Sequence, residues 1–144
     1  MNRIKVNLPE SFSFKTEIPL RITDINYGGH LGNDKILSLI QEARVRFLKN
    51  LGYSEMDVEG FGIIMLDAAV QYKSESFYGD IMLIEVGAGD FDKLGFDMYY
   101  RLSNKETGKE IAIAKTGIAI FDYDKRKVVP VPEKFILKVT KKEN

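Results

Sequence analysis

The chain of 144 residues contains no cysteine, no tryptophan and a single histidine. Without cysteine it can form no disulfide, no thiolate nucleophile and no cysteine-ligated metal site, which suits a reducing cytoplasm. A single histidine cannot pair with another around a metal, and no carboxylates with ligand spacing lie near it, so we expect neither a metal nor another cofactor. Lys+Arg and Asp+Glu both number 21, and this balance gives no reason to expect nucleic acid as a partner.

Long hydrophobic runs are also missing. No stretch approaches the roughly 20 apolar residues of a membrane span, and the start of the chain lacks the apolar run of a signal peptide. There is no internal repeat, low-complexity tract or linker, and 144 residues suffice for one core. We therefore expect a single domain, residues 1–144, in the cytoplasm and not attached to a membrane.

The clearest periodicity predicts a long amphipathic helix. Apolar residues recur at helical spacing at Ile36, Ile40, Ala43, Phe47 and Leu51. Asn33 or Asp34 is a suitable N-cap, and Gly52 is suited to end the helix. The charged tail from Lys138 to Asn144 is expected to fray.

The rest of the chain is predicted to be antiparallel strands. The predicted strands cover residues 12–22, with Pro19 confining the strand to an edge or bulge, and then 63–72, 81–88, 96–102 and 110–121. The last is apolar on both faces, which is typical of an interior strand. One long helix and about five strands predict an α+β fold in which a curved sheet wraps the helix. Apolar residues such as Ile118 and Ile120 are expected on the other face, where a homodimer or homotetramer would cover them.

The loop before the helix is the best candidate for a site. Residues 24–33, Asp-Ile-Asn-Tyr-Gly-Gly-His-Leu-Gly-Asn, combine a carboxylate, a carboxamide, the histidine and three glycines. Glycine permits positive φ and a close approach of the backbone to a ligand. The helix start offers free N–H groups and partial positive charge, which can stabilise a carbonyl oxygen as it becomes negative.

These residues carry a family resemblance. The run 21–33, followed by Gln41-Glu42-Ala43-Arg44 and by Leu51-Gly52, resembles the hotdog-fold 4-hydroxybenzoyl-CoA thioesterase-like family. The loop also resembles that of plant acyl-carrier-protein thioesterases, and Val70-Gln-Tyr72 leading to Tyr78-Gly79-Asp80 is similar to the family's second strand and turn. The resemblance implies a hotdog domain that hydrolyses an acyl-CoA or acyl-ACP thioester. In the 4-hydroxybenzoyl-CoA branch an aspartate stands where this chain has Asn26.

Three loop side chains are the candidate catalytic residues. Asp24, on which the plant-type resemblance falls, either polarises a water and orients His30 or closes a turn. His30 is either a general base at neutral pH or a residue that fixes the loop. The Asn26 amide either donates to the thioester oxygen and orients water or serves the turn.

Further residues are candidates for binding the substrate. The N–H groups of Gly32, Asn33 and Asp34 are expected to hold the thioester carbonyl oxygen. Tyr72 and Lys73 are expected to line a channel for the pantetheine arm. Two further acidic residues are considered. Glu42 is interpreted as one half of a helical ion pair with Arg46 in preference to a catalytic residue. Asp67 lies either at the dimer interface or in the neighbouring subunit's site.

Two alternative functions remain at this stage. Hotdog enoyl-CoA hydratases carry Asp-x-Asn-Pro-x-His, which residues 24–30 partly resemble. A non-catalytic protein that binds acyl thioesters would keep the fold without the chemistry. A covalent serine intermediate is not expected, because the chain has no G-x-S-x-G elbow.

Overall fold

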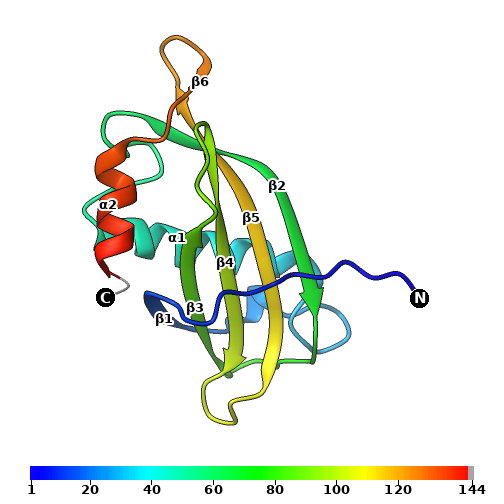
Figure 1. The fold of residues 1–144 in the computed structure, drawn as a ribbon. Helices are drawn as coiled ribbons and strands as arrows, with labels where there is room; N and C mark the ends of the chain where they lie inside the picture. The colour runs from blue at the N-terminus through cyan, green and yellow to red at the C-terminus, as the bar shows by residue number, and fades with distance from the viewer. Residues whose placement is uncertain (143–144) are drawn as a thin grey trace.

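The computed structural model describes residues 1–142. Its elements are β1 (Phe14–Pro19), η1 (Ile22–Asp24), η2 (Asn33–Lys35), α1 (Ile36–Asn50), β2 (Gly62–Tyr72), β3 (Ile81–Gly89), β4 (Gly95–Asn104), β5 (Glu110–Asp122), β6 (Lys127–Val129) and α2 (Glu133–Lys142). The strands form one antiparallel sheet in the order β1-β3-β4-β5-β2, and β6 pairs with the end of β5. Figure 1 shows this curved sheet with α1 lying across one of its faces, which confirms the predicted hotdog arrangement.

The core lies between α1 and the concave face of the sheet. Ile40, Phe47 and Leu48 of α1 are buried against fully buried side chains of the two central strands, Met98, Tyr100, Leu102, Ile118 and Ile120. The prediction that Ile118 and Ile120 lie on the other face was therefore wrong. Because β5 is buried along both faces, its sequence could not reveal which residues point towards the helix.

The convex face of the sheet is charged, and the chain's own N-terminal segment crosses it (Figure 1). Lys115 lies 3.7 Å from Asp67 and 3.6 Å from Asp97, measured between its amine and a carboxylate oxygen. The Arg101 guanidinium lies over the Phe12 ring, 5.3 Å from its centroid. This face is therefore not the bare apolar surface that we expected a second subunit to cover. Asp67 contacts this face of its own chain, where its carboxylate accepts the Gly117 N–H at 3.0 Å.

The start of α1 and the C-terminal segment differ from the sequence expectation. Asn33 to Lys35 form the short η2 turn, and Lys35 occupies the N-cap of α1 with no side-chain cap, so the predicted Asn33 or Asp34 cap is wrong. Gly52, with φ of 87°, follows the helix as predicted. The predicted fraying at 138–142 is also wrong, because these residues belong to α2, which buries Phe135 and Val139. Residues 143–144 lie outside the described part of the chain.

No helix within residues 1–142 is both long and apolar enough to span a membrane.

Candidate active site

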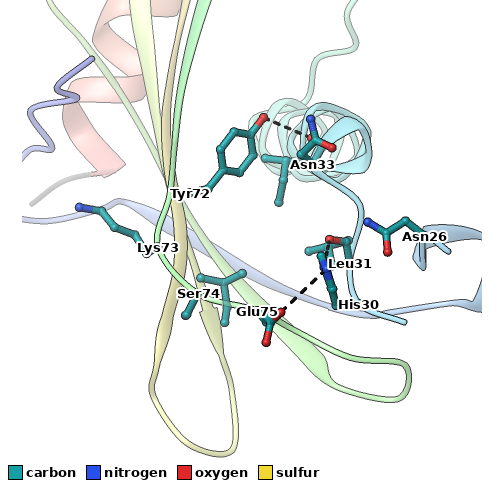
Figure 2. Close-up of a pocket in the computed structure, with 10 residues that line it drawn as sticks. Asn26, His30, Leu31, Asn33, Tyr72, Lys73, Ser74 and Glu75 are labelled. Carbon is teal, nitrogen blue, oxygen red and sulfur yellow. Dashed lines mark hydrogen bonds and ion pairs between the residues drawn. The ribbon is translucent and has the colours of Figure 1, made fainter. Parts of the chain in front are cut away.

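A cavity of about 310 Å³ lies between the start of α1 and the end of β2. Five predicted site residues line it together: Asn26, His30, Asn33, Tyr72 and Lys73. Figure 2 shows that they come from the loop before α1 and from β2 with the segment that follows it. The apolar part of the wall comes from Leu31, Ile36 and Ile111.

The loop is held by its own backbone in a compact turn. The Asn26 N–H donates to the His30 carbonyl at 2.9 Å, and the Gly29 N–H donates to the Asn26 carbonyl at 3.0 Å. Gly29 has φ of 83°, a conformation that glycine adopts without strain. The side-chain oxygen Oδ1 of Asn26 accepts the Gly28 N–H at 2.9 Å. This turn brings Asn26 and His30 to the same cavity.

Asp24 serves the turn that precedes this loop. Its side chain is buried, and Oδ2 accepts the backbone N–H of Arg21 at 2.8 Å. Asp24 is not among the residues that line the cavity. Of the two roles that the sequence left open, the contacts favour the turn.

The three expected oxyanion donors are not equivalent. The Gly32 N–H already donates to the Asp24 carbonyl at 3.0 Å, so it is the least available of the three for a substrate oxygen. Sequence spacing could not show that the chain folds back on Asp24 at this point. The N–H groups of Asn33 and Asp34, in contrast, have no hydrogen-bond acceptor within residues 1–142. They remain candidate donors at the start of the helical segment.

His30 contacts a residue that the sequence reasoning missed. Its Nδ1 lies 3.2 Å from the Leu31 carbonyl oxygen, and its Nε2 lies 3.9 Å from Oε1 of Glu75 (Figure 2). A carbonyl can only accept, so this contact favours the neutral tautomer with a proton on Nδ1, in which Nε2 is the basic nitrogen. Glu75 is 45 positions from His30, and no spacing pattern in the sequence connects the two.

Tyr72 and Lys73 differ in what they can reach. The Tyr72 hydroxyl donates to the Asn33 carbonyl at 3.4 Å, which places the ring beside the helix start. The Lys73 amine points away from His30 and Asn26 (Figure 2). Their contact with a pantetheine arm stays a prediction.

The Gln41-Glu42-Ala43-Arg44 stretch has structural contacts. The Arg46 Nε donates to Glu42 at 2.8 Å, as expected for a helical ion pair. Arg44 is buried and donates to Glu55 at 2.7 Å and to the Tyr100 hydroxyl at 3.2 Å. Burial alone would lower the pKa of Arg44, but the Tyr100 and Glu55 oxygens outweigh it and raise this pKa. Arg44 thus stays charged and ties α1 to the sheet.

The cavity therefore combines Asn33 with its free backbone N–H, a carboxamide and an imidazole with one basic nitrogen. This set can stabilise a developing oxyanion and accept a proton from water. No group of three or more metal-ligating side chains is placed to hold a metal ion in the described part of the chain.

Comparisons with known proteins agree with this fold. A family model described as the thioesterase-like superfamily matches residues 20–139. A curated relative from Aquifex aeolicus (strain VF5), which carries an esterase name, is 25% identical over 132 residues, 90% of this chain and 98% of its own length. The structure resembles a 1,4-dihydroxy-2-naphthoyl-CoA thioesterase from Synechocystis, with a TM-score of 0.82 and 19% identity over 91% of this chain and 98% of that one.

A thioesterase from Thermus thermophilus, solved with coenzyme A and Zn, has a TM-score of 0.80 and 20% identity over 94% of this chain and 98% of that one. At these identities the structural likeness establishes the fold. The family model covers most of the chain, and its match agrees with the loop and helix residues described above. The chain belongs to the thioesterase-like superfamily.

Proposed function

We propose that this protein hydrolyses an acyl-CoA thioester in the cavity at the start of α1. The observation that carries the proposal is the meeting of Asn33, whose N–H is free, with Asn26 and His30 around one cavity. Membership of the superfamily and the likeness to coenzyme A thioesterases support acyl-CoA as the donor. The three relatives described above give no comparable support to acyl-carrier protein.

The proposed reaction uses these groups in a fixed order. The thioester oxygen accepts the Asn33 N–H, with the Asn26 amide as a further donor. A contact of the Asp34 N–H with this oxygen stays a prediction. A water attacks the carbonyl carbon as it gives a proton to Nε2 of His30. The tetrahedral intermediate then collapses, the carbon–sulfur bond breaks, and the imidazolium returns that proton to the thiolate. The products are the free acid and coenzyme A.

We further propose that the working unit is a homodimer joined at β2. This strand is the edge of the sheet, and its residues 65–68 are exposed. Met65 pairs with Ile118, and Ala68 pairs with Thr116. Directly paired residues share a face of the sheet, so Met65 and Ala68 lie on the concave side, but α1 does not cover them. Leu37 of α1 is exposed as well. An exposed edge strand beside apolar side chains favours pairing with a second copy. The tetramer and the cytoplasmic location stay predictions.

Thiol release from a panel of short, medium and aromatic acyl-CoAs tests the proposed activity. Because the chain has no cysteine, a thiol reagent detects only released coenzyme A and gives no protein background. We expect turnover with at least one member of the panel. Hydration of crotonyl-CoA without thiol release would favour the hydratase instead. Binding of acyl-CoA without either reaction would favour the non-catalytic alternative.

A further inference from the structure

We infer that Glu75 is the carboxylate of this active site and acts through His30. It takes the place of the carboxylate that a related branch has at position 26, where this chain has asparagine. The inference rests on the proposed function and adds a positioning residue to it. Glu75 lies in the segment that follows β2, on the side of the cavity opposite the glycine loop (Figure 2).

The other acidic groups near the loop are not placed for this role. The Asp24 carboxylate is buried against the Arg21 N–H, and neither Asp24 nor Asp34 lines the cavity. Position 26, where a related branch has an aspartate, carries an amide. Among the residues that the structure describes, Glu75 is the one carboxylate in the cavity wall.

The two ring nitrogens of His30 give this carboxylate a specific task. The Leu31 carbonyl accepts from Nδ1, which leaves Nε2 unprotonated and facing Glu75 Oε1 at 3.9 Å. When Nε2 takes a proton from the attacking water, the ring becomes a cation with one N–H on each side. The Leu31 carbonyl then faces one N–H and the Glu75 carboxylate faces the other. Opposite charge at this distance stabilises the imidazolium until its proton passes to the departing thiolate sulfur.

The chain around Glu75 is fixed by its neighbours. The Ser74 hydroxyl donates to the Glu110 carbonyl at 2.6 Å. The Ser76 carbonyl accepts the Leu31 N–H at 2.7 Å, and its hydroxyl donates to Asp80 at 2.9 Å. The Ser76 contact ties this segment directly to the residue after His30. These contacts fix the backbone of Glu75 beside the His30 loop, while its side chain is 65% exposed.

Space on the loop side also favours a reaction at Nε2. A Cβ added at Gly28 would lie 3.2 Å from His30 Nε2 and 3.2 Å from Asn26 Oδ1. Any larger residue would therefore crowd the edge of the ring that faces the amide. Glycine at this position leaves that edge open to a water.

A double-mutant cycle tests the inference. We expect His30→Gln to lower kcat roughly 10²-fold, as loss of a general base does. Glu75→Gln should lower kcat about tenfold and change KM by no more than about twofold. This fall in kcat is smaller than the one that follows the loss of a buried triad carboxylate, because Glu75 is exposed. Glu75→Asp should recover part of the loss. In the His30→Gln background, Glu75→Gln should have no further effect, because Glu75 acts through the imidazole. Glu106→Gln, at an exposed position of the β4–β5 hairpin that does not line the cavity, is the matched control and should behave as wild type.

The outcomes separate this inference from the proposed function. If wild type releases thiol while Glu75→Gln keeps full kcat, the role of Glu75 is overturned and the thioesterase stands. Equal losses from Glu75→Gln in both backgrounds would show that it acts independently of His30, which also overturns the inference. A wild type inactive on every acyl-CoA overturns the proposed function and this role with it. As a readout independent of turnover, the nitrogen-15 spectrum of the sole histidine should show a proton on Nδ1 in the neutral ring, and a proton on Nε2 instead would overturn the proposed proton path.

Discussion

Asn26 has two functional ends, and the structure gives each a different environment. Its Oδ1 closes the turn with the Gly28 N–H, while its amide nitrogen has no acceptor within residues 1–142. The amide can therefore serve the loop and a substrate oxygen together. The two roles that the sequence left open for Asn26, turn and catalysis, are compatible in this geometry.

Asn26→Asp separates these roles. The carboxylate keeps an acceptor for the Gly28 N–H, but it replaces the amide donor with negative charge where the oxyanion develops. We expect kcat to fall roughly 10²-fold with the fold intact, measured by thiol release and circular dichroism. Asn7→Asp, an exposed change in the N-terminal segment, is the control. An Asn26→Asp enzyme as fast as wild type would mean that this site works with a carboxylate at position 26.

Residue identities predicted part of the site and missed part of it. Asn26, His30 and Asn33 could be found because glycines and polar residues precede a helix, and that pattern is local. The hydrogen bond from the Gly32 N–H to the Asp24 carbonyl depends on how the loop folds. The position of Glu75 depends on β2, a strand far along the chain. Single-sequence patterns do not contain that information.

At the scale of elements, α1 is tied to the sheet by a buried polar network. Arg44 donates to Glu55 and Tyr100, and the Tyr100 hydroxyl contacts the Thr116 hydroxyl at 2.8 Å. Periodicity predicted the helix, because its apolar stripe is regular. It could not predict a buried arginine on that helix, since arginine is ordinarily exposed.

Arg44→Met should destabilise the protein. Removing the guanidinium leaves Glu55 without its cationic partner and takes one hydrogen bond from the Tyr100 hydroxyl. Breaking a buried ion pair costs about 3 kcal/mol or more. We expect the free energy of unfolding, measured in urea, to fall by about 3 kcal/mol. This is the low end of the range for a buried pair, because the Glu55 side chain is 23% exposed. The control is Lys105→Met, which removes an exposed pair with Glu17 and should change stability by less than about 1 kcal/mol. If Arg44→Met and Lys105→Met lowered the free energy of unfolding equally, the proposed stabilisation by the Arg44 network would be contradicted.

Three tyrosines predict a loss of stability at high pH. Burial is the main cause that raises the pKa of Tyr53, Tyr99 and Tyr100, and carboxylates near the first two add to it. A raised folded-state pKa means that the neutral form is favoured on folding, so this stability is present below about pH 10, the ordinary tyrosine value, and is lost above it. Unfolding in urea at pH 8 and pH 11 should show the loss. The loss of stability between pH 8 and pH 11 should be smaller in the double variant Tyr53→Phe, Tyr99→Phe. An equal loss in the double variant would contradict ionisation of these tyrosines as its cause.

The elements after the sheet show where sequence patterns failed. α2 buries Phe135 and Val139, which are spaced one helical turn apart, but its lysines led to the expectation of a frayed tail. β6 has three residues, too few for an alternating pattern. Both segments owe their structure to packing against the sheet, which propensity does not report.

For the whole molecule, the prediction of an oligomer now rests on a different surface. The convex face of the sheet is covered by charged pairs and the N-terminal segment, whereas the edge of β2 is open. The sequence analysis expected a second subunit to cover apolar residues, but it placed those residues on the wrong face. The free strand edge could be recognised only from the order of the strands.

Met65→Lys tests the proposed dimer. The added charge lies on the exposed concave side of β2, so sedimentation should show a shift towards monomer, and activity should fall if the partner completes the site. Leu137→Lys places the same charge on α2 at a similarly exposed leucine and should leave the dimer intact. A wild type that sediments as a monomer would contradict the proposed assembly.

The central claim is that the cavity at the start of α1 hydrolyses thioesters. The direct measurement is steady-state thiol release from acyl-CoA by wild type and His30→Gln, with folding of both checked by circular dichroism. We predict turnover in the wild type and a loss of roughly 10²-fold in the variant. Equal rates in the two proteins, or no release from any acyl-CoA by wild type, would contradict it.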